Sequence, residues 1–222
     1  VINDCPDLKS IKKSIENEDI IDLNDYVLDV FNISNCPNIT SIINVELSSD
    51  TIQDNFCNNL GITTLNGFFK SSYTPRVIGS YFCNGCNIIK VDYLFENKPI
   101  EIVGRYFLAN NPITSAMGIF KGSKLKAIPE NMLLNSKLKY LRYAFQECLE
   151  LSSNIYSDHL INFEYLIDIA YMFDNCINLV GNHIDYIEWK GMGYLPQLSE
   201  YQYCYRRCIS LEDYNSIDSS LK

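Results

Sequence analysis

One spacing constrains this chain more than any other feature: between positions 85 and 148 a small or polar residue recurs every 12 or 13 residues. The recurring residues are Gly85, Asn97, Asn110, Gly122, Asn135 and Cys148. Apolar residues flank them at three-residue steps, as Phe145 and Leu151 flank Cys148. Self-similarity at a fixed short period is typical of an array in which each unit packs only on its neighbours. Two half-units make one coil of about 25 residues, so the spacing predicts a repeat solenoid.

Within each coil the sequence favours short strands joined by turns. Residues 87–95 and 137–145 alternate polar and apolar side chains, as half-buried strands do. Gly, Asn and Pro fall at the boundaries of such segments. Each strand can pair in parallel with its counterpart in the next coil. The predicted fold is therefore mostly β, with short parallel strands and little helix.

The array is expected to fill the whole chain, 1–222, as one domain. Its three predicted parts are irregular first coils over 1–80, regular coils over 81–182, and an aromatic-rich loop with a terminal capping coil over 183–222. Residues 12–31 are acidic and fit neither a clean helix nor a clean strand, so we interpret them as an insertion with one or two helical turns. Residues 70–78 are interpreted as a linker into the regular coils.

Charge and hydropathy exclude several classes of partner. The net charge is −9 and the lysines and arginines form no cluster larger than a pair, which argues against nucleic acid and against an anionic membrane surface. The longest apolar runs are far too short to cross a bilayer.

Nine cysteines, an odd number, are interpreted as reduced and structural. Five of them share one repeat position: Cys5, Cys36, Cys148, Cys176 and Cys208. A free cysteine behaves as a small buried side chain, which suits a tight turn inside a stack. The close pairs Cys83–Cys86 and Cys204–Cys208 are over a hundred residues apart, so no zinc site and no other metal site is predicted.

The repeat unit of Phe, Cys or Asn, Leu and Ile resembles the BspA-like (Treponema-type) leucine-rich repeat. The phrases that carry the resemblance are AFQECLEL, IFKGSKLKAIPENMLLNSKLKYLRYAF, MFDNCINLVGN and CYRRCISLEDYNSIDSSLK. It covers residues 82–222 well and 1–80 loosely. The chain departs from the family in its irregular first third and in having few prolines at coil ends, Pro129 being one. The second and last phrases are also similar to repeats in tail-fibre and other virion proteins of bacteriophages that infect gut bacteria.

The resemblance implies a leucine-rich-repeat fold and a non-enzymatic recognition module on the surface of a phage tail or virion. Its partners would be a host-surface glycan or protein and other virion or tail proteins, and a homotrimer is one expected assembly. The family supplies no catalytic residues and no cofactor. The alternative is an adhesin of the same repeat class, on the bacterial cell surface or secreted. A third hypothesis, ranked lower, is a polysaccharide depolymerase.

No catalytic motif surrounds His159 or His183, and no glycine-rich phosphate loop is present. The acidic residues of 12–31 lack the spacing of a calcium loop, which favours a solvated face. The longest departure from the repeat lies between Cys176 and Cys208, and this region holds the only tryptophan. Exposed aromatic clusters with cations mark binding surfaces. The candidate ligand-binding residues are Tyr186, Trp189, Lys190, Tyr194, Tyr201, Tyr203, Arg206 and Arg207.

Two alternatives to that site stay open. The aromatic residues could instead close off the end of the core, since a terminal coil needs a cap. A second candidate surface is the strand face that carries Lys137, Lys139 and Arg142.

Overall fold

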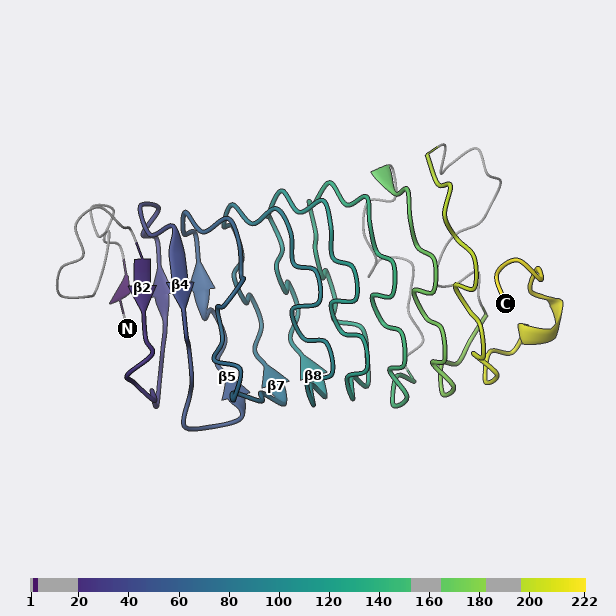
Figure 1. Ribbon diagram of the computed structural model, residues 1–222, viewed down its shortest axis with the longest axis horizontal. Helices are drawn as coiled ribbons and strands as arrows, with labels where there is room; N and C mark the ends of the chain where they lie inside the picture. Colours follow the sequence, from purple (N-terminus) through teal and green to yellow (C-terminus); the bar gives the residue numbers. More distant parts are fainter. Residues whose placement is uncertain (1, 4–19, 153–164, 183–196) are drawn as a thin grey trace.

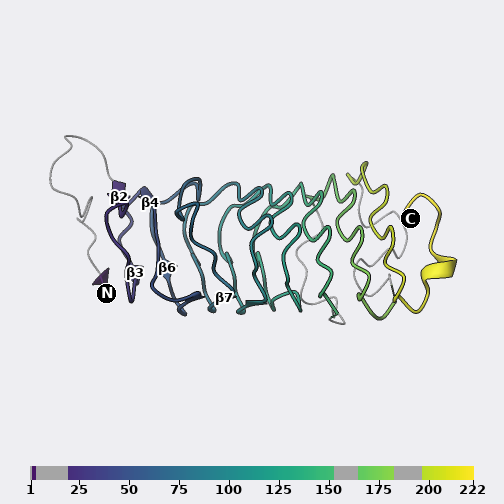
Figure 2. The same cartoon turned by 60° about the horizontal axis from the view of Figure 1, so that its bottom comes forward.

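The computed structural model describes residues 2–3, 20–152, 165–182 and 197–222. Over these residues the chain consists of very short parallel strands and turns, and helix is almost absent. Successive stretches lie side by side along the long axis, from the N-terminus at one end to the C-terminus at the other (Figure 1). The view turned by 60° shows the same order (Figure 2), so sequence neighbours are also neighbours in space.

The strands form three small sheets in which all pairs are parallel. The first sheet contains β1 (Ile2–Asn3), β3 (Ile33–Ser34) and β6 (Cys57–Asn58), and the second contains β2 (Ile20–Asp22) and β4 (Ser41–Ile43). The third contains β5 (Thr51–Ile52), β7 (Val77–Ile78) and β8 (Ile102–Val103). One 3-10 helix, η5 (Tyr214–Ser216), lies near the C-terminus. The predicted short parallel strands and scarcity of helix are confirmed. Among the described residues no helix has the length and apolarity needed to cross a bilayer.

A row of single parallel bridges joins the later stretches. It runs through Thr64, Lys90, Ser115, Tyr140, Asp168 and Glu200, each bridged to the next, at intervals of 25 to 32 residues. We call each stretch between successive bridge residues a rung, and we use the same word for the equivalent stretches before Thr64 and after Glu200. The predicted strands over 87–95 and 137–145 are wrong in extent, because each contributes one bridge residue only. The backbone turns soon afterwards at left-handed residues, Tyr93 and Tyr143, which interrupts the pairing.

The first third is more regular than its sequence indicates. Residues 20–31 are not an insertion with helical turns: β2 pairs with β4, Leu28 bridges Leu47, and Phe31 is buried. Residues 12–19 lie outside the described residues. The predicted linker over 70–78 is also corrected, because β7 occupies its end and pairs with both β5 and β8.

Two columns of stacked aromatic rings fill the core. The first is Phe31, Phe56, Phe82 and Phe107, and the second is Phe69, Phe95, Phe120, Phe145, Phe173 and Tyr205. Ring centroids in consecutive rungs lie 5.2 to 6.0 Å apart. Each ring contacts its counterpart in the next rung, so the aromatic residue recurs with the period of the rungs along each column.

The repeat predicted from the sequence assigned Gly122 and Cys148 to one position, but they occupy two adjacent positions of the rung. The backbone N–H of Gly122 donates to the carbonyl of Gln146, which places Gly122 beside Glu147 and not beside Cys148. Gly122 and Glu147 both have positive φ, 67° and 61°, a conformation that glycine and asparagine tolerate best. The next residue is buried instead, and there Ser123 lies beside Cys148, with 3.5 Å between Oγ and Sγ.

The cysteines at this buried position link consecutive rungs. The thiols of Cys148, Cys176 and Cys208 donate to the carbonyl oxygens of Phe120, Phe145 and Phe173 at 3.0 to 3.1 Å. Burial raises the pKa of Cys148 and of Cys208 to about 12, so both thiols keep the proton that they donate. The predicted buried, structural role is confirmed for these three. The other described cysteines are also buried and form no disulfide, and Cys5 lies outside the described residues.

A row of alternating charges gives the fold a testable dependence on pH. Glu101 accepts from Arg76 Nε and from Lys126 Nζ, both at 2.9 Å, in the rungs on either side. The hydrogen bonds from Lys126 and Arg76 lower the pKa of Glu101 from 4.5 to about 2. A carboxyl whose pKa is lower in the folded state stabilises the fold above its unfolded pKa, and that contribution is lost as the pH falls.

We therefore expect Glu101→Gln to flatten the acid side of the stability curve between about pH 4.5 and 2. Melting temperature measured against pH tests this, with the exposed Glu212→Gln as the matched control. Parallel curves for wild type and Glu101→Gln across that window would rule the interaction out as a source of stability.

Candidate binding surface

Half of the predicted ligand-binding residues lie outside the residues that the structure describes. These are Tyr186, Trp189, Lys190 and Tyr194. The other four lie in the last rung: Tyr201, Tyr203, Arg206 and Arg207. The described residues therefore test only the C-terminal half of that site.

Tyr203 is the last member of a row of tyrosines that runs across consecutive rungs. The backbone N–H of Tyr143 donates to Ala170, and that of Tyr171 donates to Gln202. The three tyrosines are therefore equivalent residues in neighbouring rungs. Ring centroids lie 5.3 Å apart for Tyr143 and Tyr171 and 5.1 Å apart for Tyr171 and Tyr203. We call Tyr143, Tyr171 and Tyr203 the tyrosine column.

The backbone explains why these rings stand outside the core. Each tyrosine of the column has positive φ, between 58° and 62°. The residue two positions later is the buried core ring, as Phe145 follows Tyr143 and Phe173 follows Tyr171. The left-handed turn thus separates an outer ring from an inner ring in every rung that carries the pattern.

Arg206 stacks against the tyrosine column. Its guanidinium carbon lies 5.2 Å from the ring centroid of Tyr171 and 5.3 Å from that of Tyr203. The buried carboxylate of Asp174, which is 2% exposed, accepts from Arg206 Nε at 2.8 Å and from a terminal guanidinium nitrogen at 2.7 Å. This hydrogen bonding by Asp174 raises the pKa of Arg206. A paired carboxylate fixes both the plane and the position of a guanidinium, so Arg206 is held in place against the rings.

Arg142 joins the opposite end of the column. Its guanidinium lies 5.8 Å from the ring of Tyr143, and its Nε donates to Asp168 at 2.6 Å. Of the second predicted surface, only Arg142 belongs here. No hydrogen bond or ion pair connects the side chain of Lys137 or Lys139 to the column within the part of the chain that the structure describes.

The structure places Tyr201 against the core and Arg207 on the surface, and no contact of the Arg207 side chain with the column is recorded among the described residues. Tyr201 is half-buried and packs against the core, which agrees with the alternative that the terminal aromatics cap the array. Arg207 is exposed, has a φ of 64°, and donates its backbone N–H to the hydroxyl of Tyr214 at 3.1 Å. The predicted cluster is thus divided between a surface column and a cap.

The column offers a ligand hydrogen-bonding groups and cations rather than open ring faces. Neighbouring tyrosine rings lie in contact at tilts of 32° and 36°, and the Arg206 guanidinium lies over the rings of Tyr171 and Tyr203. Because these contacts involve the ring faces, we expect a ligand to meet ring edges, hydroxyl groups and the guanidinium groups. Tyr and Arg in this arrangement provide rigid contact area at a low cost in conformational entropy.

The sequence contains a signal for this surface that the prediction missed. Tyr143 and Tyr171 each stand two residues before a core phenylalanine, and Tyr203 stands two residues before Tyr205. This Tyr-x-aromatic pattern marks the column residues, but it also occurs at Tyr93 and Tyr201, which lie outside the column.

The described residues contain no group of three or more His, Cys, Asp or Glu side chains that could hold a metal ion. Comparison with protein-family models, with curated proteins and with solved structures finds no match. The function proposed below is therefore supported by the surface and by the resemblance of the repeats.

Proposed function

We propose that this chain is a leucine-rich-repeat-type solenoid that serves as a non-enzymatic recognition module on a bacteriophage tail or virion. In this proposal it binds a host-surface glycan or protein through the tyrosine column. The rows of equivalent residues in consecutive rungs support the solenoid assignment, because each rung repeats the same outer and inner positions. The phage-like final repeat supports the location.

One observation carries the binding role: a column of stacked tyrosines whose arginine is held by a buried carboxylate. Asp174 and Arg206 are joined by two hydrogen bonds, and Arg206 in turn contacts two tyrosine rings. Burying a carboxylate to fix a surface arginine costs desolvation free energy. A preorganised Tyr–Arg surface lowers the entropy lost on binding, which is the advantage that such a surface offers.

Replacing a column tyrosine should weaken attachment without unfolding the array. Tyr203 is 41% exposed, so Tyr203→Ala removes contact area and little of the core. We expect binding to fall at least about tenfold, the effect of removing an aromatic anchor. The measurement is binding of labelled protein to whole bacterial cells and to arrayed bacterial surface polysaccharides.

Tyr106→Ala is the matched control, because Tyr106 stacks on Tyr81 at 4.9 Å in a separate pair of rungs. Equal binding by wild type and Tyr203→Ala would overturn the assignment of the column. Trp189→Ala, in the same assay, tests the part of the predicted site outside the described residues.

The two competing hypotheses have their own tests. A secretion leader or cell-wall anchor in the full-length gene would favour the bacterial adhesin, and a tail-attachment domain would favour the phage protein. Release of oligosaccharide from host capsule by the purified protein would favour the depolymerase, and its absence would remove that hypothesis.

A further inference from the structure

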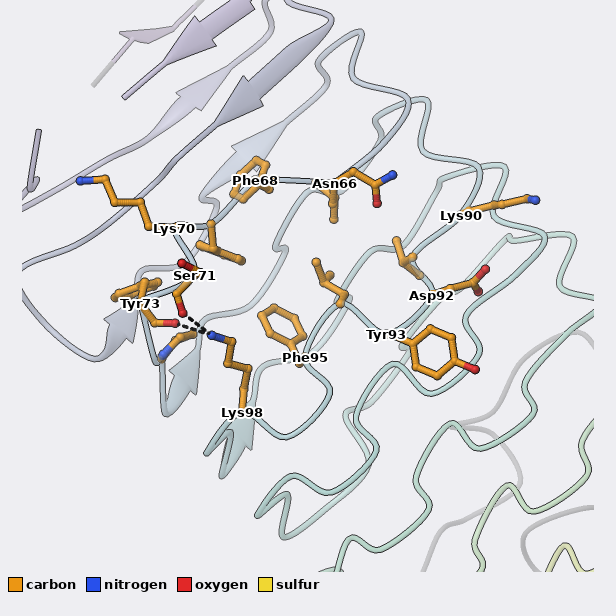
Figure 3. Close-up of a pocket in the computed structure, with 16 residues that line it drawn as sticks. Asn66, Phe68, Lys70, Ser71, Tyr73, Lys90, Asp92, Tyr93, Phe95 and Lys98 are labelled. Atoms are coloured by element: carbon orange, nitrogen blue, oxygen red, sulfur yellow. Dashed lines mark hydrogen bonds between the residues drawn. The ribbon is translucent and has the colours of Figure 1, made fainter. Parts of the chain in front are cut away.

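A cavity of about 210 Å³ opens between residues 65–75 of one rung and residues 90–98 of the next (Figure 3). Buried rings line it, including Phe68 and Phe95. The polar side chains of Asn66, Asp92 and Lys98 also line it. The cavity is thus apolar in its floor and polar at its rim, as small-molecule sites are.

The cavity exists because the row that forms the tyrosine column is interrupted at this point. The bridges from Thr64 to Lys90 and on to Ser115 place Gly67, Tyr93 and Gly118 at equivalent positions. A Cβ atom on Gly118 would clash with the Tyr93 ring, so that ring rests against Gly118.

The Gly67 side of Tyr93 is open. A Cβ atom on Gly67 would meet only a methyl group of Ile43, at 3.9 Å. Tyr93 is therefore stacked on no other ring among the described residues, and 41% of it is exposed. Unlike the rings of Tyr143, Tyr171 and Tyr203, its ring is available to a ligand that enters the cavity.

Lys98 supplies a cation at the rim. Its ammonium group donates hydrogen bonds to the carbonyls of Ser71 and Tyr73, each at 3.0 Å (Figure 3). An ammonium has three N–H donors, so one donor remains. Within the described parts of the chain, Lys98 forms no ion pair with a carboxylate.

Most of the charged side chains that line the cavity are cations, whereas the chain as a whole is acidic. Lys90, which is exposed, and Lys98 both line the cavity, and Lys70 also lines it but is paired with Glu46 at 2.8 Å. The carboxylate in the lining, Asp92, already accepts from the Ser115 hydroxyl and from the N–H of Met117. A local excess of cations in a chain of net charge −9 selects an anionic ligand.

We propose that this cavity binds one carboxylate-bearing sugar residue of an acidic polysaccharide. The sugar ring would stack on Tyr93, its carboxylate would accept from Lys98, and its hydroxyl groups would reach Asn66. A second hollow shares Asn66, Lys90 and Asp92 with this cavity, which leaves room for the next sugar of a chain. The site is separate from the tyrosine column, so it goes beyond the proposed function and does not depend on it.

A matched pair of ligands tests the charge requirement. Isotope-labelled protein is titrated with methyl β-D-glucuronide and with methyl β-D-glucoside, which differ at the carboxylate, and with acetate, which lacks the ring. We expect amide shifts around Asn66, Tyr93 and Lys98, with the glucuronide bound at least tenfold more tightly than either of the others. Equal binding of the glucoside, or of acetate, would overturn the proposal, since it would show an apolar hollow or a simple anion patch.

Two variants test the residues. Lys98→Met should weaken glucuronide binding at least tenfold, and Lys124→Met, which replaces an exposed lysine away from the cavity, should leave it unchanged. Should Lys98→Met fail to fold, Tyr93→Leu at an exposed position gives a second measurement, with at least threefold weaker binding expected. Wild-type affinity in a folded variant of either residue would also overturn the proposal. Tyr203→Ala should leave the titration unchanged, which separates this site from the column.

Discussion

Phe120→Ala should lower the free energy of unfolding by about 3–5 kcal/mol, the range measured for truncating a buried phenylalanine. Phe120 is fully buried and lies between Phe95 and Phe145, with centroid distances of 5.9 and 6.0 Å. Removing the ring leaves a void that breaks the second aromatic column in its middle. The neighbouring rungs cannot close over it, because their own spacing is set by backbone hydrogen bonds between rungs.

Chemical denaturation followed by circular dichroism measures this loss, and amide hydrogen exchange locates it. In an array each rung contacts mainly its neighbours, so protection should fall first in the rungs of Phe95 and Phe145. Phe120→Leu is the control, with an expected loss below about 1.5 kcal/mol because most of the volume is kept. A loss under 1 kcal/mol for Phe120→Ala would mean that the aromatic column does not determine stability.

The length of the repeat could be predicted from the sequence because packing in the core fixes it. A ring such as Phe145 must contact a ring in each adjacent rung, so the aromatic residue recurs with the period of the backbone. The exact phase could not be predicted, because two adjacent positions both accept small or polar residues for different reasons. Gly122 satisfies a left-handed turn, while Ser123 fills a buried space.

The candidate surfaces were harder to predict for a related reason. The predicted binding site lies where the repeat is irregular, so it includes Tyr203 and Arg206 of the column but leaves out Tyr171, which lies in a regular rung. The cavity beside Tyr93 depends on the absence of a ring at Gly67. A missing ring at one position of a row can be recognised only when the register between rungs is known.

Asp174→Asn should destabilise the protein by about 1.5–3 kcal/mol, the range for hydrogen bonds to charged groups. Asp174 accepts from both Gln146 and Arg206. An asparagine of the same shape presents an NH₂ group to one of these donors and leaves the guanidinium without its counter-charge. The loss should stay below that of a fully buried ion pair, because the Arg206 side chain is 37% exposed and keeps part of its hydration. Glu147→Gln, an exposed carboxylate in the adjacent rung, should change stability by less than about 0.5 kcal/mol.

A double-mutant cycle separates the pair from the two side chains. If Asp174 acts mainly by holding Arg206, Arg206→Met should remove much of the effect of Asp174→Asn, and the two changes should not add. The same cycle can be measured with cell binding, which tests the tyrosine column. Asp174 is buried and cannot touch a ligand. Any loss of binding in Asp174→Asn must therefore act through Arg206 and the two tyrosines that it contacts. Additive effects in both assays would show that Asp174 stabilises its own rung independently of Arg206. Arg206 would then not be positioned for binding by Asp174.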